Sequence, residues 1–323
     1  MKGAIVQRLA LGFVLIVAVI VLNFLLLQAA PGDVVDAMLA EGGGGDPKLA
    51  AKLRETYGLD QPIYIQLWKY LGQVLTGDLG YSFYYDETVT ELILGHLPTT
   101  LLLTLSALVV AVIVGTLFGV YSAMRPHGIF SHFVTVFSLF GYATPVFWLG
   151  MIILLVFALH IPIFPAFGIR SIPEPEGTFN QILDIINHLV LPVFTLAILY
   201  LASYSRISRA SMLDVLGADY VRTARTKGMS EFSVIFKHAL KNAALPVVTL
   251  AGLQLGQIFS GAVLVETVFS LPGVGPLLYE SIVRRDYPVI LGVLFGAAAT
   301  TIVANIVTDL LYKQLDPRIE SIT

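Results

Sequence analysis

Long stretches without charged side chains are the feature that most constrains this sequence. Six runs contain no Asp, Glu, Lys or Arg, and they cover residues 9–32, 92–124, 126–169, 185–205, 242–265 and 287–308. A helix needs about 20 apolar residues to cross the hydrocarbon core of a bilayer, and ionised groups are costly there. We therefore expect each run to cross a membrane once.

The composition agrees with a chain whose solvent is lipid. Charged residues make up 13% of the 323 residues and hydrophobic residues 56%, with a mean hydropathy of +0.82. Soluble domains carry about a quarter charged residues. The absence of Cys excludes disulfides, thiolate metal sites and Cys nucleophiles, and the net charge of -3 is too small to indicate a nucleic-acid partner.

The third run is long enough for two helices, but polar residues and prolines occupy its two ends. We expect one span near Phe133 to His160, because a hairpin there would reverse the orientation of everything downstream. With the N-terminus inside, twelve of the 19 Lys and Arg residues fall in cytosolic segments. The positive-inside rule then places both termini in the cytosol.

The first run has a second interpretation as a cleavable signal peptide. Lys2 and Arg8 precede it, and small residues stand at its end at Ala29 and Ala30. The run is longer than a usual signal core, which favours a retained span. Cleavage would leave the other five spans oriented as before.

The predicted organisation follows from these runs. Residues 1–32 form the N-terminus and first span, 33–97 an extracytoplasmic subdomain, 98–312 a core with the remaining five spans, and 313–323 a cytosolic tail. The outer subdomain is either a solvated connector or a contact surface for a soluble partner or the channel mouth. Within the core, residues 206–242 form the largest cytosolic segment.

Two short helices are predicted in that cytosolic segment. The first covers Asp214 to Lys227 and ends at Gly228, which acts as a C-terminal cap. Ser230 can cap the second helix. Its apolar stripe consists of Phe232, Ile235, Phe236, Ala239 and Leu240, with Lys237 and Lys241 off the stripe.

The amphipathic pair has three possible partners. It can lie on the bilayer surface, pack against the ends of its own spans, or insert into another protein.

Polar residues inside the spans are the candidates for a translocation path. Gln254, Gln257 and Ser260 follow one another at intervals of three, so they share one face of a continuous helix. They either line the path or hydrogen-bond between helices. Tyr142, Thr144 and Asn305 are further candidates.

Three other positions in or beside the spans carry an expectation. Pro145 and Pro192 should kink their helices, and Glu266, at the outer end of the fifth span, should meet water.

Several blocks of the sequence resemble one family. They are 57–62 (Tyr-Gly-Leu-Asp-Gln-Pro), 77–82, 97–100, 220–228, 236–246, 269–275, 285–288 and 315–319, which cover nearly the whole chain. In this order they are similar to ABC importer permeases of the oligopeptide, dipeptide and nickel branch. Arg222-Thr223-Ala224, followed by Gly228, stands where the wider family has Glu-Ala-Ala and Gly in its coupling loop.

The resemblance implies an all-α polytopic protein with six transmembrane helices of the type I importer permease fold, in the bacterial cytoplasmic membrane. It would pair with a homologous permease and form the path for di- or oligopeptides delivered by a periplasmic binding protein. Two cytosolic subunits would bind ATP and Mg, and this chain would hold no cofactor or metal. The implied ATPase-coupling residues are Tyr220, Arg222, Thr223, Ala224, Lys227, Gly228, Phe232, Ile235 and Phe236.

Other functions stay open to different degrees. Similar permeases import nickel, opine-like compounds or oligosaccharides, and a sensor or assembly subunit without transport is a further possibility. An ion-coupled transporter usually has charged groups deep in its spans, and the six runs have none of the four charged types. An enzyme is not expected, because the sequence lacks a Gly-x-x-x-x-Gly-Lys-Ser/Thr phosphate loop and a nucleophile elbow near His160 or His188.

Overall fold

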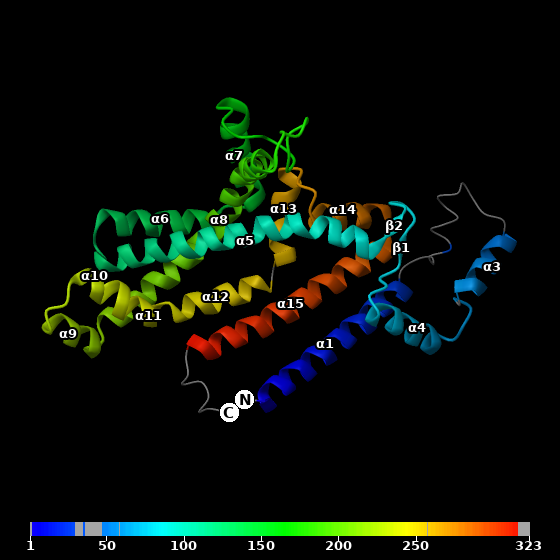
Figure 1. Ribbon diagram of the computed structural model, residues 1–323, viewed down its shortest axis with the longest axis horizontal. Coiled ribbons are helices and arrows are strands. Elements are labelled where there is room, and N and C mark those ends of the chain that lie inside the picture. The colour runs from blue at the N-terminus through cyan, green and yellow to red at the C-terminus, as the bar shows by residue number, and fades with distance from the viewer. Residues whose placement is uncertain (1, 30–34, 36–46, 58, 257, 316–323) are drawn as a thin grey trace. The chain divides into compact units, whose positions relative to one another are not determined.

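The computed structural model describes residues 2–29, 35, 47–57, 59–256 and 258–315 (Figure 1). The chain divides into two compact units. One unit comprises residues 1–98 and 276–302, and the other comprises residues 99–275 and 303–323. Two helices, α5 (Val89–Met124) and α15 (Tyr287–Leu315), run from one unit into the other along the sequence.

The first unit combines the two ends of the sequence. It contains α1 (Lys2–Ala29), α3 (Pro47–Tyr57), α4 (Ile63–Leu75), the strands β1 (Tyr81–Ser82) and β2 (Glu87–Thr88), most of α14 (Val274–Arg284), and the first parts of α5 and α15. The Asn23 side-chain amide of α1 donates a 3.1 Å hydrogen bond to the carbonyl of Leu291 in α15. Such bonds hold helices together in lipid, where water cannot satisfy the amide.

The strands β1 and β2 form an antiparallel hairpin that is fastened to α14 and the turn after it. Tyr81 lies opposite Thr88 in the register. The Ser82 hydroxyl donates to the Asp286 carboxylate, and the Tyr85 hydroxyl lies 3.1 Å from a carboxylate oxygen of Glu280. Burial, with the Glu280 charge as a smaller cause, raises the pKa of Tyr85 to about 12. The hairpin and α14 are therefore joined by side-chain contacts.

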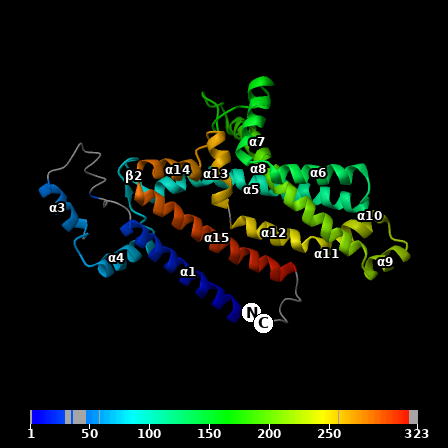
Figure 2. The ribbon, with the colours of Figure 1, turned by 180° about the vertical axis from the view of Figure 1, so that it is seen from behind.

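The second unit is built around one long helix, α8 (Thr178–Leu216). Against it pack α6 (Ile129–Ala143), α7 (Val146–Leu154) with its π-helical continuation η1 (Leu155–His160), α12 (Leu245–Leu255) and α13 (Ile258–Val268). Figure 1 and Figure 2 both show α6 and α8 side by side. The fully buried residues Leu103, Leu196, Tyr204 and Ala262 lie in the core that these helices form with α5.

Two glycines let α5 approach α8 closely. A Cβ atom on Gly115 would lie 2.7 Å from the Tyr204 Cβ, and one on Gly119 would lie 2.5 Å from the Ser208 Cβ. The Ser208 hydroxyl donates to the Thr116 carbonyl at 3.1 Å. Small residues are the usual means by which membrane helices bring their backbones together. These two helices are in contact through their main chains.

Several of the expected spans are recognisable among the described residues. Three helices there are long and apolar enough to cross a membrane, namely Val89–Met124, Thr178–Leu216 and Tyr287–Thr308. Two bent helix pairs raise the number to as many as five if each pair counts as one span. The first expected span corresponds to α1, in which Ala10–Leu26 forms a shorter apolar segment. The described residues thus agree with a polytopic helical protein.

The third expected span bends sharply in its middle. Its halves, Ile129–Ala143 and Val146–His160, meet at 106°. Thr144 and Pro145 have extended backbones there, with ψ near 127° and 129°. Proline has no N–H to donate and disfavours a helical conformation in the residue before it. The kink predicted at Pro145 is therefore confirmed, whereas α8 stays helical through Pro192.

Candidate functional site

The first half of the predicted coupling segment is a short helix that ends at Gly228. The helix α9 (Asp219–Thr226) follows a break at Gly217 and Ala218, so the prediction of one helix from Asp214 to Lys227 is wrong at its start. Gly228 has a φ of +73°, and the Met229 N–H lies 3.4 Å from the Ala224 carbonyl. Glycine adopts this left-handed conformation without strain. The predicted stop is confirmed.

The second half begins with the predicted cap and then changes its helical form. The Ser230 hydroxyl accepts a 3.4 Å hydrogen bond from the Ser233 N–H at the start of α10 (Glu231–Ser233). The Arg225 guanidinium donates to Glu231 at 2.8 Å, which ties the end of α9 to the start of α10. The chain continues as a π-helical segment, η2 (Val234–Ala239), and then as α11 (Leu240–Ala243).

Most of the predicted apolar stripe packs against the chain's own helices. Ile235 is 3% exposed, Ala239 is fully buried, and Phe236 and Leu240 pack against the same cluster. The cluster also contains Val120, Ala123, Met212, Val221, Ala224, Val234 and Ala243, from α5, α8, α9, η2 and α11. We call residues 219–243 the coupling element. Its inner face rests on α5 and α8.

Phe232 departs from the predicted stripe. Its side chain is 72% exposed and lies with its ring 4.7 Å from the ring of Phe236, which in turn is 6.4 Å from the ring of Tyr121. The predicted stripe assumes the α-helical period, but η2 has the wider π-helical turn. Val234, which is not part of the predicted stripe, is therefore buried, whereas Phe232, which is part of it, is exposed.

The outer face of the coupling element carries polar and aromatic side chains. Tyr220 is 43% exposed, and its hydroxyl accepts a 2.8 Å hydrogen bond from the Asn242 amide. Arg222 lies 3.8 Å from Asp219, and the Thr223 hydroxyl donates to the Asp219 carbonyl at 2.9 Å. Lys227 is also exposed. The residues predicted for coupling thus divide into a packed face and an exposed face.

The translocation-path candidates do not form one group among the described residues. The Tyr204 hydroxyl donates a 2.6 Å hydrogen bond to Gln254, which links α8 to α12. That contact is the interhelical alternative left open by the sequence. The helix carrying Gln254 ends at Leu255, while Gln257 and the side chain of Ser260 lie outside the described residues.

The other three path candidates have separate surroundings. Tyr142 is 66% exposed, and the Arg206 guanidinium lies 5.6 Å from the centre of its ring. The Thr144 hydroxyl donates to the Phe140 carbonyl at 2.7 Å beside the Pro145 bend. Asn305 is exposed on α15.

Glu266 corrects one expectation. The sequence places it in water at the end of a span, but its side chain is fully buried. One carboxylate oxygen accepts a 2.9 Å hydrogen bond from the Gly275 N–H, and a Cβ on Gly273 would lie 2.3 Å from the carboxylate carbon. The Thr100 hydroxyl accepts from the Val274 N–H at 2.9 Å. The chain after α13 therefore folds back and encloses the carboxylate.

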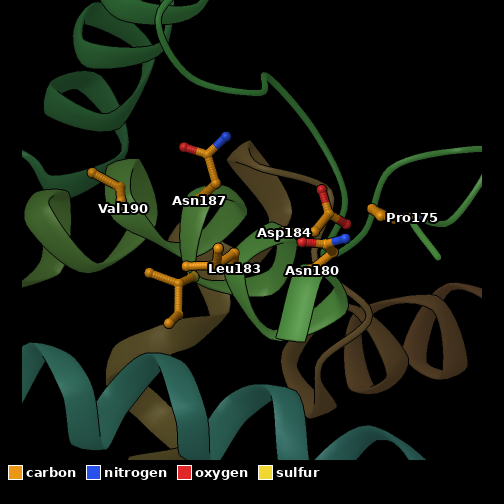
Figure 3. Close-up of a pocket in the computed structure, with 7 residues that line it drawn as sticks. Pro175, Asn180, Leu183, Asp184, Asn187 and Val190 are labelled. Atoms are coloured by element: carbon orange, nitrogen blue, oxygen red, sulfur yellow. The ribbon is translucent and has the colours of Figure 1, made fainter. Parts of the chain in front are cut away.

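A groove beside the N-terminal part of α8 was missed in the sequence. It has a volume of about 490 Å³ and is lined by Pro175, Asn180, Leu183, Asp184, Ile186, Asn187 and Val190 (Figure 3). The Asp184 carboxylate accepts hydrogen bonds from the Ser171 N–H at 2.7 Å and its hydroxyl at 2.6 Å, and His188 lies 3.4 Å away. The available signal in the sequence was an Asp–His pair at i, i+4, with Asp184 immediately before an apolar run and His188 inside it.

The comparisons with known proteins bear on what these surfaces serve. A family described as "Binding-protein-dependent transport system inner membrane component" matches residues 115–321. The chain belongs to this family. The family's N-terminal module, "Binding-prot-dependent transport system membrane comp, N-term", matches residues 1–104. The chain is thus an inner-membrane component of a transport system that depends on a binding protein.

Individual relatives match over nearly the full length. An oligopeptide transport system permease protein, AppB of Bacillus subtilis, is 40% identical over 325 residues, covering 99% of this chain and 100% of the relative. A di/tripeptide permease protein, DppB of Pseudomonas aeruginosa, is 40% identical with 99% of both chains covered. The dipeptide permease protein DppB of Escherichia coli is 37% identical with 98% of both covered. The resemblance in the sequence motifs is therefore confirmed.

Proposed function

We propose that this chain is one of two homologous permease subunits of an ATP-driven importer of di- or oligopeptides. The observation that carries the solute class is the 37–40% identity to permeases named for such peptides, over nearly the whole of each chain. The path for the peptide runs between the two permeases. Two cytosolic ATPase subunits bind ATP and Mg, and a periplasmic binding protein delivers the peptide.

Reconstituted transport tests the solute and the mechanism together. Proteoliposomes with the binding protein, both permeases and the ATPases should take up labelled dipeptide only with ATP, and omitting the sister permease should abolish uptake. ATP-dependent uptake of nickel ions or oligosaccharides, with no uptake of peptides, would assign the transporter to another class of solute. Uptake driven by an ion gradient without ATP would overturn the importer assignment.

The proposed topology has six spans and both termini in the cytosol. It is supported by the excess of Lys and Arg in the segments assigned to the inside. Because the chain has no Cys, single substitutions report sidedness directly. In intact cells, a membrane-impermeant maleimide should label Asp60→Cys and leave Lys227→Cys unlabelled until the membrane is opened. The reverse pattern would contradict the orientation.

For the energy-coupling step, we propose that the coupling element inserts into a cleft of an ATPase subunit. Its buried face, with Ile235 and Ala239, packs on α5 and α8, and its opposite face leaves Arg222 and Phe232 open to a partner. Closure of the ATPase pair would displace the element as a rigid body. That displacement would reach α8 through the buried cluster and α12 through α11.

Truncating the exposed face separates docking from folding. Arg222→Ala with Phe232→Ala removes only exposed groups, so the permease should fold normally, bind the ATPase subunits more weakly and lose peptide-stimulated ATP hydrolysis. Ile172→Ala is the matched control, because Ile172 is 98% exposed in a segment assigned to the outside. Unchanged stimulated hydrolysis in the double variant would refute the docking surface.

For the path, we propose Tyr142, Thr144, Gln254, Gln257, Ser260 and Asn305 as its polar lining. Gln254 offers the sharpest test, because its hydrogen bond to Tyr204 supplies a matched control. A role in the path predicts that Gln254→Leu changes the KM for peptide uptake more than Tyr204→Phe does. Equal effects of the two substitutions would assign Gln254 to helix packing alone.

A further inference from the structure

The helix α4 has three different sides. Val74 is 4% exposed, and Tyr70 and Gln66 lie on the same side, one and two turns earlier. Tyr64, Trp68 and Leu75 lie on another side, at 65%, 71% and 49% exposure. Residues four or seven apart share a helix face, so the second group forms one continuous stripe. We call Tyr64, Trp68, Leu71 and Leu75 the α4 stripe.

The third side of α4 is polar. Lys69 and Gln73 are four residues apart and both exposed, so they share one side of the helix. This side is different from the side that faces α1 and from the side that carries the α4 stripe. A helix with an apolar stripe and a separate polar side fits a boundary between hydrocarbon and water. If α4 were surrounded by water, the apolar side chains of the α4 stripe would stay exposed to solvent, which is unfavourable.

The side with Tyr70 holds α4 against the end of α1. The Tyr70 ring lies 5.9 Å from the Phe24 ring, and the Gln28 amide donates a 3.0 Å hydrogen bond to the Gln66 side-chain oxygen. Figure 1 and Figure 2 show α4 crossing α1 near the C-terminal end of α1. The attachment thus occupies the last two turns of a helix in a membrane component.

The exposed surface of α1 at the same level is apolar. Leu22, Leu25 and Leu26 are 55%, 54% and 49% exposed and lie within the two turns that carry the α4 contacts. At this level α1 therefore presents an apolar surface, as a membrane-spanning helix does where it meets acyl chains. The α4 stripe lies on the helix that is attached to α1 at the same level.

The side chains of the α4 stripe suit this boundary. Tyr and Trp gather at membrane interfaces because each combines an apolar ring with a polar group that reaches the headgroups. We propose that α4 lies in the bilayer interface at the end of α1, with the α4 stripe in the headgroup and acyl boundary and Lys69 in water. This inference goes beyond transport, and its depth readout does not depend on the proposed orientation.

Spin labels can measure the depth. The assembled complex is placed in nanodiscs of phosphatidylethanolamine and phosphatidylglycerol, with a nitroxide on Trp68→Cys, and the unsubstituted complex serves as the labelling blank. Oxygen concentrates in lipid and a nickel chelate in water. For a stripe buried about 5–10 Å into the boundary, the ratio of oxygen to chelate collision rates should be at least about threefold higher than at Lys69→Cys.

A second position guards against an effect of losing Trp68 itself. Leu75→Cys keeps Trp68 and belongs to the same stripe, so it should give the same lipid-like ratio. Chelate access at Trp68→Cys and Leu75→Cys equal to that at Lys69→Cys would overturn the proposal. Protection of these labels that appears only on addition of the binding protein would overturn it as well, and would assign the stripe to that partner.

Discussion

Two amphipathic segments of this chain use their apolar residues differently. In the coupling element, Ile235 and Ala239 are buried in the chain's own cluster. In α4, Tyr64 and Trp68 are mostly exposed, and the covered side contains Tyr70 and Val74 instead. An apolar stripe therefore predicts that some surface will cover it, but not which surface. The following predictions test this difference from the largest effect to the smallest.

The largest effect is expected from a charge placed in the buried cluster. Ile235→Asp should lower the free energy of unfolding by about 3–5 kcal/mol, because the carboxylate would be buried without a partner. Phe232→Asp, at an exposed position of the same element, should stay within about 0.5 kcal/mol. Thermal unfolding of the permease in detergent, without the ATPase subunits, measures both. Similar losses in the two variants would mean that Phe232 is buried too.

A smaller effect is expected at the turn between the two halves of the coupling element. Gly228→Val forces a β-branched residue to a φ of +73° and should cost about 1–2 kcal/mol. Gly228→Asn, which tolerates this conformation, should lose less. Both are checked by thermal unfolding and by peptide-stimulated ATP hydrolysis. A fully stable Val variant with normal stimulation would show that the turn does not set the element's position.

The α4 stripe should respond to the solvent around it. Trp68→Ala should destabilise the permease on the order of 1 kcal/mol in bilayers and less in detergent, because the ring leaves a lipid boundary. Thermal unfolding without the ATPase subunits measures this, and Phe232→Ala is then a matched control, since the two rings are 71% and 72% exposed. It should give the same small change in both media. If the two variants lost the same stability in bilayers and in detergent, the α4 stripe would not differ from the coupling element in its contact with lipid.

The smallest effect concerns the contact between α4 and α1. Burial raises the pKa of the Tyr70 hydroxyl from 10.0 to about 12. The folded chain therefore holds this proton more tightly than the unfolded chain. The contribution of Tyr70 to the stability of the contact between α4 and α1 is complete below pH 10 and is lost as the pH rises towards 12. A nitroxide on Trp68→Cys should become more mobile only in that range. If the nitroxide became equally mobile over this pH range in a Tyr70→Phe background, the change would belong to the titration of another group.

The parts of the fold that follow from local chemistry could be predicted from the sequence. Gly228 ends α9 and Ser230 caps α10, because backbone conformation and capping depend on a few neighbouring residues. The bend at Pro145 follows from the missing N–H of proline. The apolar runs indicate the long helices because lipid tolerates few charges.

The features that depend on distant residues could not be predicted. The burial of Glu266 requires Gly273 and Gly275 to fold back over it, and the position at the end of a span gives no sign of that return. The π-helical turn of η2 changes the stripe by burying Val234, whereas periodicity assumes one helical form throughout. The partner of Gln254, Tyr204, lies 50 residues away.

The close contact of α5 and α8 has a mechanical consequence. Because Gly115 and Gly119 carry no side chains, the α5 backbone lies directly against backbone and Cβ atoms of α8, which leaves little room for one helix to move without the other. A force applied where Val120 and Met212 meet the coupling element therefore acts on both helices at once. Under the topology and docking proposed above, the pair would move as one rigid body, and a small displacement at its cytosolic end would be carried into the membrane.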